Sequence, residues 1–325
     1  MMERLLRECR LCPRDCGANR WQGQKGFCGV DKTLRLARAA LHPWEEPCLI
    51  GEKGSGAVFF SGCGLKCVYC QNYDIAVATA GEPVEISRLA EIFLELQDQG
   101  AANINLVTAA QYVPQTVRAL ELAKEQGLTL PVVYNSGGYE KVETLKLLEG
   151  LVDVWLPDYK YRSRELARRL SRAEDYPEQA ARALDEMVRQ AGGEAFAADG
   201  RMLRGVIVRH LVLPGQKEDS KAVVRFLRER YGDRIYLSLL KQYTPLPRMR
   251  AWPQLNRRVT TYEYQQVVDY ALSLGVTKGY MQKGETAKES FIPAFDGQGV
   301  ARGKDESDEI SDICSGRVSG GQPDS

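Results

Sequence analysis

Three cysteines lie close together at a spacing that suits an iron–sulfur cluster with one open coordination position. Cys63, Cys67 and Cys70 form a C-x3-C-x2-C pattern directly after the apolar run 57–60. A fully ligated electron-transfer cluster takes four cysteines, and so does a closed structural zinc site. Three thiolates on one loop would hold three corners of a cubane and leave the fourth iron open for an outside molecule. The alternatives are a zinc site or thiols that bind no metal.

A second group of cysteines precedes this loop. Cys9, Cys12, Cys16 and Cys28 form a C-x2-C-x3-C-x11-C pattern within residues 1–50, which show many glycines and little periodicity. Such a segment buries little apolar surface by itself, so a metal is expected to organise it. Four thiolates suit a structural zinc ion or an auxiliary iron–sulfur cluster, and the sequence leaves both open, together with thiols that bind no metal.

The composition sets the class of protein. The chain has 325 residues, 44% hydrophobic and 27% charged, with a net charge of +1. This balance gives no reason to expect nucleic acid or an anionic membrane as a partner. No apolar run reaches the roughly 20 residues of a membrane span, and the first residues are too charged for a secretory signal. We therefore expect a cytoplasmic protein, where clustered cysteines bind metals more often than they form disulfides.

Strand and helix patterns alternate from about residue 55. Strands are expected at 57–60, 104–107, 131–134, 152–156, 206–213 and 235–240. Helices are expected from Ser87 to Gly100, from Pro114 to Gly127, up to Gly150, from Asp175 to Gly192, over 219–231 and from a Thr260–Glu263 capping box onward. The pattern favours a parallel sheet covered by helices, either doubly wound or a barrel, with its chemistry at the carboxyl ends of the strands. The tail from about residue 296, with Cys314, is expected to be disordered.

The cysteine loop resembles that of the radical S-adenosylmethionine (SAM) superfamily. It reads SGCGLKCVYCQN over 61–72, with Tyr69 directly before the last cysteine. Further stretches resemble a branch similar to pyruvate formate-lyase activating enzymes (PflX-type, incompletely characterised). They are CRLCPRDCG (9–17), HPWEEPC (42–48), GSGAVFFSGC (54–63), YNSGGY (134–139), LPDYK (156–160) and RHLVLPG (209–215).

The resemblance implies a fold and an activity. The fold would be a partial (β/α)6 barrel over 51–283, with a cysteine-rich segment at 1–50 and a C-terminal segment at 284–325. A [4Fe–4S] cluster would cleave SAM reductively, and the resulting 5′-deoxyadenosyl radical would abstract a substrate hydrogen. The first expected substrate is a glycine of a glycyl radical enzyme or peptide, with a flavodoxin- or ferredoxin-type electron donor. The alternatives are another peptide or a small molecule as substrate, and, outside catalysis, a metal-binding scaffold.

The same likeness suggests residues that contact SAM. Asp158 and Lys160 resemble an Asp-Leu-Lys element of the activating enzymes, so Lys160 would approach the SAM carboxylate and Asp158 would hold the ligand or a monovalent cation. Asn135 and Ser136 stand where those enzymes carry Asp-Thr, and Arg209 corresponds to an arginine that faces the cavity. All these positions follow predicted strands, where functional residues of such folds gather.

One stretch departs from the pattern. The segment that usually binds the SAM amine is Gly-Gly-Glu-like in many relatives and Thr-Pro-Thr-His in this branch, but 108–111 reads Thr-Ala-Ala-Gln. Gln111 keeps hydrogen bonding but cannot shuttle a proton as histidine does. Either substrate handling is altered, or Thr108 and backbone carbonyls bind the amine.

Several other polar residues have two interpretations. His42, Glu45, Glu46 and Cys48 lie just before the first predicted strand of the core, and they are either solvated and packing residues or part of the site. His210, within an apolar strand, is more typical of a hydrogen-bonded core histidine than of a catalytic one.

Overall fold

A run of parallel strands forms the centre of the protein, seen in a computed structural model that describes residues 2–282 and 293–302. The strands are β2 (Ser55–Phe60), β4 (Ile104–Val107), β5 (Val132–Ser136), β6 (Val154–Pro157), β8 (Met202–Leu211), β9 (Tyr236–Leu240) and β10 (Gly279–Met281). They neighbour one another in the order of the chain, and each adjacent pair is parallel. A doubly wound sheet reverses its strand order at a switch point, whereas a barrel adds strands in one direction. The structure therefore has the barrel arrangement, and the prediction of a partial barrel is confirmed.

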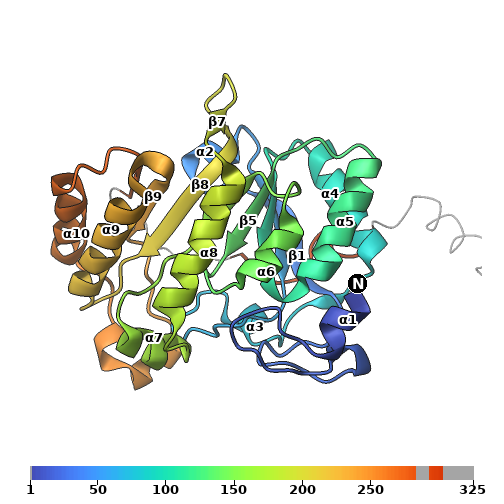
Figure 1. The fold of residues 1–325 in the computed structure, drawn as a ribbon, viewed down its shortest axis with the longest axis horizontal. Helices are drawn as coiled ribbons and strands as arrows, with labels where there is room; N and C mark the ends of the chain where they lie inside the picture. The colour runs from blue at the N-terminus through green and yellow to red at the C-terminus, as the bar shows by residue number, and fades with distance from the viewer. Residues whose placement is uncertain (1, 283–292, 303–325) are drawn as a thin grey trace, which may run out of the picture.

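The helices cover one face of this sheet (Figure 1). The longer ones are α4 (Ile86–Asp98), α5 (Val113–Glu125), α7 (Arg164–Ser171), α8 (Tyr176–Ala191), α9 (Lys217–Tyr231) and α10 (Thr261–Ser273), and the capping box at Thr260 and Glu263 is present. The third predicted helix is only a turn, α6 (Val142–Leu145) with a 3-10 turn at Lys146–Leu148, and α7 was not predicted. Ser87 does not cap α4, because that helix begins one residue earlier after Glu85. Within the described parts of the chain, no helix is long and apolar enough to cross a membrane.

Alternation along the strands sorts their side chains between two faces. Leu106, Tyr134 and Trp155 are fully buried in the large core between sheet and helices. Their neighbours Asn105 and Asn135 project from the opposite face, toward the inside of the barrel. Because side chains alternate with a period of two, the same strands supply the core and the wall of the interior.

Residues 35–42 belong to the sheet, contrary to the irregular structure expected for 1–50. Strand β1 (Arg35–His42) pairs antiparallel with β2 and with the short β3 (Glu82–Pro83). Five of the eight residues in its sequence, RLARAALH, are alanine or arginine, which are poor signals of a strand. Pairing with β2 overrides that weak local preference. Among the described residues before β1, the helical elements are α1 (Met2–Arg7) and the 3-10 turn η1 (Arg20–Gln22).

Part of the predicted tail docks onto this added strand. The backbone N–H of Ala39 donates to the Gln298 carbonyl at 2.8 Å, and the ring of Phe295 packs 5.6 Å from that of Phe59. The expectation of disorder from about residue 296 is therefore wrong for the first residues of that tail. Residues 303–325, with Cys314, lie outside the described residues.

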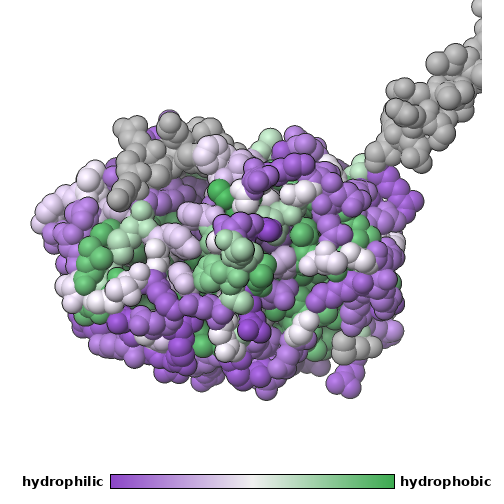
Figure 2. Space-filling view, turned by 90° about the horizontal axis from the view of Figure 1, so that it is seen from above, coloured by the Kyte–Doolittle hydropathy of each residue, from purple (hydrophilic) through white to green (hydrophobic). Residues whose placement is uncertain are grey.

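The two ends of the barrel differ. The helical turn α2 (Pro47–Ile50) closes the amino end, where Cys48 and Leu49 pack against Val133, Val154 and Ile207. In Figure 1 this end is uppermost, and the loops that follow the parallel strands lie below, beside the blue N-terminal segment. Figure 2 looks onto the amino end, whose surface is mainly hydrophilic with smaller hydrophobic areas between. The groups of cysteines lie at the opposite end.

Truncation of a core residue on β6 tests the packing of sheet against helices. The Trp155 side chain is fully buried and its ring lies 5.5 Å from that of Tyr134 at 62°. Trp155→Ala is expected to lower the free energy of unfolding by about 3–5 kcal/mol, because the cavity left behind cannot close fully. Urea unfolding followed by circular dichroism measures the loss. Trp155→Phe keeps an aromatic ring and should cost clearly less, and equal costs would contradict this account of the core.

Candidate functional site

A cavity of about 820 Å³ opens inside the barrel at the carboxyl ends of the strands. All the residues for which the sequence predicts a part in binding SAM or the cluster that cleaves it line this cavity: Cys63, Cys67, Tyr69, Cys70, Thr108, Asn135, Ser136, Asp158, Lys160 and Arg209. They come from the loop after β2 and from the ends of β4, β5, β6 and β8. Ligand pockets usually measure about 300–1,000 Å³, so this cavity can hold a cofactor-sized molecule with room beside it.

The three-cysteine loop lies between β2 and the turn α3 (Tyr73–Ala76). Cys67 is buried, Cys63 and Cys70 are partly buried, and none of them forms a disulfide. The Leu65 backbone N–H points to the sulfur of Cys63 at 3.4 Å, and the Ser171 hydroxyl donates to that of Cys67 at 3.0 Å. Donors directed at sulfur are typical surroundings of iron–sulfur clusters, whose potentials they tune. The donor set thus fits a thiolate-bound cluster.

Tyr69 holds the loop in place from within the core. Its hydroxyl lies 2.6 Å from that of Tyr161, which lies 2.8 Å from the hydroxyl of Ser171. Ser171 is the residue that donates to Cys67, so the aromatic side chain and a cysteine sulfur share one hydrogen-bonded chain. The Tyr69 ring lines the cavity, but its hydroxyl is turned into the protein.

Two arginines hold the same loop through hydrogen bonds to backbone carbonyls. No motif in the sequence indicates either of them. Arg14, from the N-terminal segment, donates to the carbonyls of Gly64 and Ser171, each at 2.7 Å. Arg248 donates to the carbonyl of Val68 at 2.8 Å and to that of Cys70. Their partners are backbone atoms far away in sequence, so no local pattern could identify them.

A ladder of charges follows β6 and β8. The Asp158 carboxylate accepts from Nζ of Lys160 at 2.6 Å and from Nε of Arg209 at 3.1 Å. Burial by itself would raise the pKa of Asp158, but the two cations outweigh it and the pKa is lowered. Likewise, burial would lower the pKa of Lys160, and Asp158 raises it instead. All these groups are charged at neutral pH, and both oxygens of Asp158 already have cationic partners.

Arg209 joins this ladder to the floor of the cavity. Its guanidinium also donates to Oδ1 of Asn135 at 2.6 Å and to Oε1 of Glu45 at 3.2 Å. Glu45 in turn accepts from Asn105 at 2.8 Å and from Asn135 at 3.2 Å. The sequence left the place of Glu45 open, and the structure puts it inside the barrel, on the cavity wall. Only the fold brings this residue next to β5 and β8.

The remaining residues that the sequence analysis considered, Ser136, Gln111 and His210, differ in their surroundings. Ser136 is buried, and its hydroxyl accepts from the Gly138 N–H at 3.3 Å. Gln111 does not line the large cavity; its amide donates to the carbonyls of Ser61 and Thr108 at 2.9 and 3.0 Å. The side chain that replaces the usual histidine therefore fixes the neighbouring backbone. His210 is a core residue, with Nδ1 2.7 Å from the Tyr159 carbonyl and a pKa lowered by burial to about 4.

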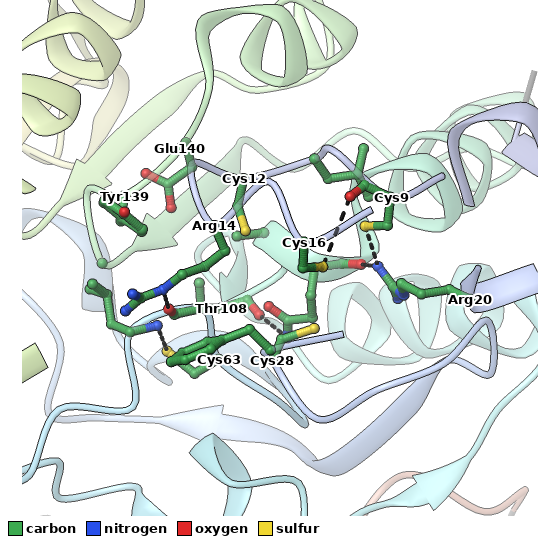
Figure 3. Close-up of a pocket in the computed structure, with 17 residues that line it drawn as sticks. Cys9, Cys12, Arg14, Cys16, Arg20, Cys28, Cys63, Thr108, Tyr139 and Glu140 are labelled. Carbon is green, nitrogen blue, oxygen red and sulfur yellow. Dashed lines mark hydrogen bonds between the residues drawn. The ribbon is translucent and has the colours of Figure 1, made fainter. Parts of the chain in front are cut away.

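The four N-terminal cysteines line a second, smaller cavity next to the first. It measures about 40 Å³, and Cys63, Leu65, Thr108 and Gly137 line both. Figure 3 shows the sulfurs of the four cysteines turned toward the same space. The two groups of cysteines are also joined by the backbone, because the N–H of Cys63 donates to the carbonyl of Cys28 at 3.4 Å.

Comparison with known proteins gives partial matches of low sequence identity. No family model matches the chain. An uncharacterised protein of Methanocaldococcus jannaschii is 28% identical over 274 residues, which are 82% of this chain and 75% of that one. Among solved structures, Streptococcus suis SuiB bound to its precursor peptide has 12% identity and a TM-score of 0.46 over 69% of this chain and 47% of its own. HydG, a maturase of the [FeFe]-hydrogenase, has 14% identity and a TM-score of 0.47 over 73% and 52%.

The chain thus spans about half the length of these two solved structures. A domain of a pyruvate-formate lyase-activating enzyme from Bacteroides vulgatus has 14% identity and a TM-score of 0.36 over 53% of this chain and 92% of its own. All three TM-scores lie below 0.5.

A buried carboxyl group in the large cavity makes stability depend on pH. Burial first, and then the neighbouring Glu45, raises the pKa of Glu46 from 4.5 to about 7, with Asp158 adding to the rise and Arg209 opposing it. Between these pH values the folded protein keeps a proton that the unfolded chain has lost, so stability falls as pH rises through this window. Glu46→Gln should therefore match the wild type near pH 4.5 and exceed it by about 3 kcal/mol above pH 7.

Thermal unfolding of both proteins from pH 4.5 to 8 measures this difference. The matched control is Glu52→Gln, which changes an exposed carboxylate close by in the chain. A gap between Glu46→Gln and the wild type that stays constant with pH would show that Glu46 does not titrate in this window.

Proposed function

We propose that this protein is a radical SAM enzyme. The observation that carries the proposal is the convergence of three free cysteines on one loop with Asp158, Lys160 and Arg209 around a single cavity. The cysteines come from the end of β2 and the charged residues from the ends of β6 and β8. A thiolate set and a cationic wall facing the same space suit a cluster beside a ligand that bears a carboxylate.

In this proposal, each part of the cavity binds either the cluster or one part of SAM. Cys63, Cys67 and Cys70 would hold a [4Fe–4S] cluster, and Lys160 with Arg209 would bind the carboxylate of SAM. Thr108 and the end of β4 would receive its amino group, and Asn135 and Ser136 would position the rest of the molecule. When bound, the reduced cluster supplies the electron that splits SAM into methionine and a 5′-deoxyadenosyl radical able to abstract a substrate hydrogen.

The chain's own residues would orient the reactants and exclude water. Gly137 lets the turn after β5 lie close to the cysteine loop, because a Cβ there would come within 2.9 Å of Leu65. Asp158 keeps Lys160 charged and holds it against the cavity wall. A monovalent cation at Asp158, expected from the resemblance, would have to share oxygens that already contact Lys160 and Arg209.

Within this class, we propose a glycine Cα–H of a partner enzyme or peptide as the first substrate to test. Its support is the likeness of the segments around Asp158 and Arg209 to activating enzymes. Reducing power would come from a flavodoxin- or ferredoxin-type protein. The runner-up is a small molecule, which a cavity of about 820 Å³ can also hold.

The decisive experiment is a SAM cleavage assay on protein purified and reconstituted without oxygen. After reduction with dithionite, formation of 5′-deoxyadenosine is followed by liquid chromatography. Substrate-independent production of 5′-deoxyadenosine is the expected result. Reduced, iron-loaded protein that leaves SAM intact would overturn the proposal.

The substrate requires a separate measurement. The protein is incubated with a glycyl radical enzyme labelled with deuterium at glycine Cα, and 5′-deoxyadenosine is analysed by mass spectrometry. Transfer of deuterium supports glycyl radical activation. Cleavage of SAM without transfer from any glycyl radical enzyme of the same organism would rule out activation and leave the radical SAM assignment standing.

A further inference from the structure

We infer that Cys9, Cys12, Cys16 and Cys28 bind a second iron–sulfur cluster, adjacent to the proposed SAM site. These four thiols, none of them in a disulfide, surround the smaller cavity and belong to a segment with little core of its own. Its small apolar cluster consists of Leu6, Cys9 and Leu11 with a few partly buried neighbours. A segment so poor in apolar contacts needs another source of order, which a bound cluster provides.

The thiols are held by the backbone around them. Gly26 brings two of them together, since a Cβ placed on it would lie 3.2 Å from the Cys16 sulfur and 3.5 Å from that of Cys28. The Cys9 N–H donates to the Ala18 carbonyl at 3.0 Å, which closes the loop that carries Cys12 and Cys16. The site is therefore built by a folded loop, although it contains hardly any regular secondary structure.

Buried positive charge beside the thiols calls for a negatively charged group. Arg20 is fully buried and its Nη1 lies 3.7 Å from the Cys9 sulfur; its other partners are the carbonyls of Asp31 and Gln111. Arg14, which lines the same cavity, also donates only to carbonyls. No carboxylate of the described residues lies within ion-pair distance of either guanidinium. A cluster with four thiolates would supply negative charge beside the buried Arg20 and the partly buried Arg14.

Figure 3 shows Arg14 and Arg20 on opposite sides of the four sulfurs. The carboxyl group that lines this cavity belongs to Glu140, which is buried and whose Oε2 has no hydrogen-bond partner. It does not pair with either arginine. The positive charge around the thiols is thus left for a ligand to balance.

Four thiols that line one cavity suit an iron–sulfur cluster. In a zinc site, all four sulfurs lie about 2.3 Å from one ion and so lie close to one another. In the part of the chain that the structure describes, no three Cys, His, Asp or Glu side chains form a site ready for a single metal ion. In an iron–sulfur cluster the cysteines are distributed over different irons, which keeps their sulfurs further apart. Four thiols that line one small cavity suit the second arrangement.

Metal analysis of a variant that lacks the other cysteine group tests this inference. Cys63→Ala, Cys67→Ala and Cys70→Ala are combined, and the protein is reconstituted anaerobically with iron, sulfide and zinc all present. This triple variant is expected to retain iron and acid-labile sulfide in equal amounts, about two to four of each per chain, and no zinc. Adding Cys12→Ser and Cys16→Ser should reduce both to background, while circular dichroism shows that the barrel is still folded.

Three outcomes would overturn the inference: one zinc per chain without iron, no metal in a folded variant, or iron that persists after Cys12 and Cys16 are replaced. If the triple variant does not fold, total iron in the wild type decides instead. The inference requires about six to eight irons per chain, and about four would overturn it. Because these readouts do not involve SAM, a failure here is distinguishable from a failure of the proposed function.

Discussion

Replacing Cys67 with alanine is expected to abolish formation of 5′-deoxyadenosine, with a loss of at least about a thousandfold against the wild type. Cys67 is the buried member of the three-cysteine loop, and its sulfur receives the Ser171 hydroxyl at 3.0 Å. Removing one of three ligands leaves a cluster that cannot be both retained and open to SAM, so turnover ends. This loss exceeds about 4 kcal/mol of transition-state stabilisation. Chromatography of the products and iron analysis of the same sample measure it.

Cys48→Ala is the matched control. Cys48 is also a buried, unpaired cysteine, but it packs at the closed amino end of the barrel with Leu49 and Val133. Its replacement should leave iron content and SAM cleavage near the wild-type values. If both variants lost activity to the same extent while still folded, a general need for buried cysteines would explain the result better than cluster ligation.

The sequence predicts the central fold well because its strands and helices are strongly periodic. Ile104–Val107 has the predicted bounds of β4, and Thr260 with Glu263 forms the predicted cap of α10. Strand β1 was missed because alanine and arginine carry little strand signal, and β10, Gly279–Met281, is short. Both are formed by pairing with a neighbouring strand, which no local pattern contains.

The residues of the candidate site also fall into two groups, those that the sequence indicates and those that only the fold identifies. Cys63, Asp158 and Arg209 could be selected because motif and strand end coincide in the sequence. Glu45 could not be assigned, because its partners Asn105 and Arg209 are brought to it only by closure of the barrel. Hydrogen bonds between distant segments decide such positions, and a single sequence does not contain them.

Replacing Arg209 with methionine is expected to destabilise the protein by about 3–5 kcal/mol, because the substitution leaves buried charge without a partner. The guanidinium joins Glu45 at 3.2 Å, Asp158 at 3.1 Å and Asn135 at 2.6 Å. Asp158 would keep its contact with Lys160, whereas Glu45 would keep only neutral amide donors. Urea unfolding of the metal-free protein measures the change without interference from a cluster.

The double variant Arg209→Met with Glu45→Gln separates charge from packing. Glutamine keeps the shape of Glu45 and can still bond Asn105 and Asn135, but it removes the unpaired negative charge. Most of the lost stability should therefore return, since replacing both members of a buried pair is far less costly than removing one. If the double variant were as unstable as Arg209→Met alone, the contribution of Arg209 would lie in its packing and in its contact with Asp158. The cavity would then depend on the ladder along β6 and β8, and Glu45 would be free to serve a bound substrate.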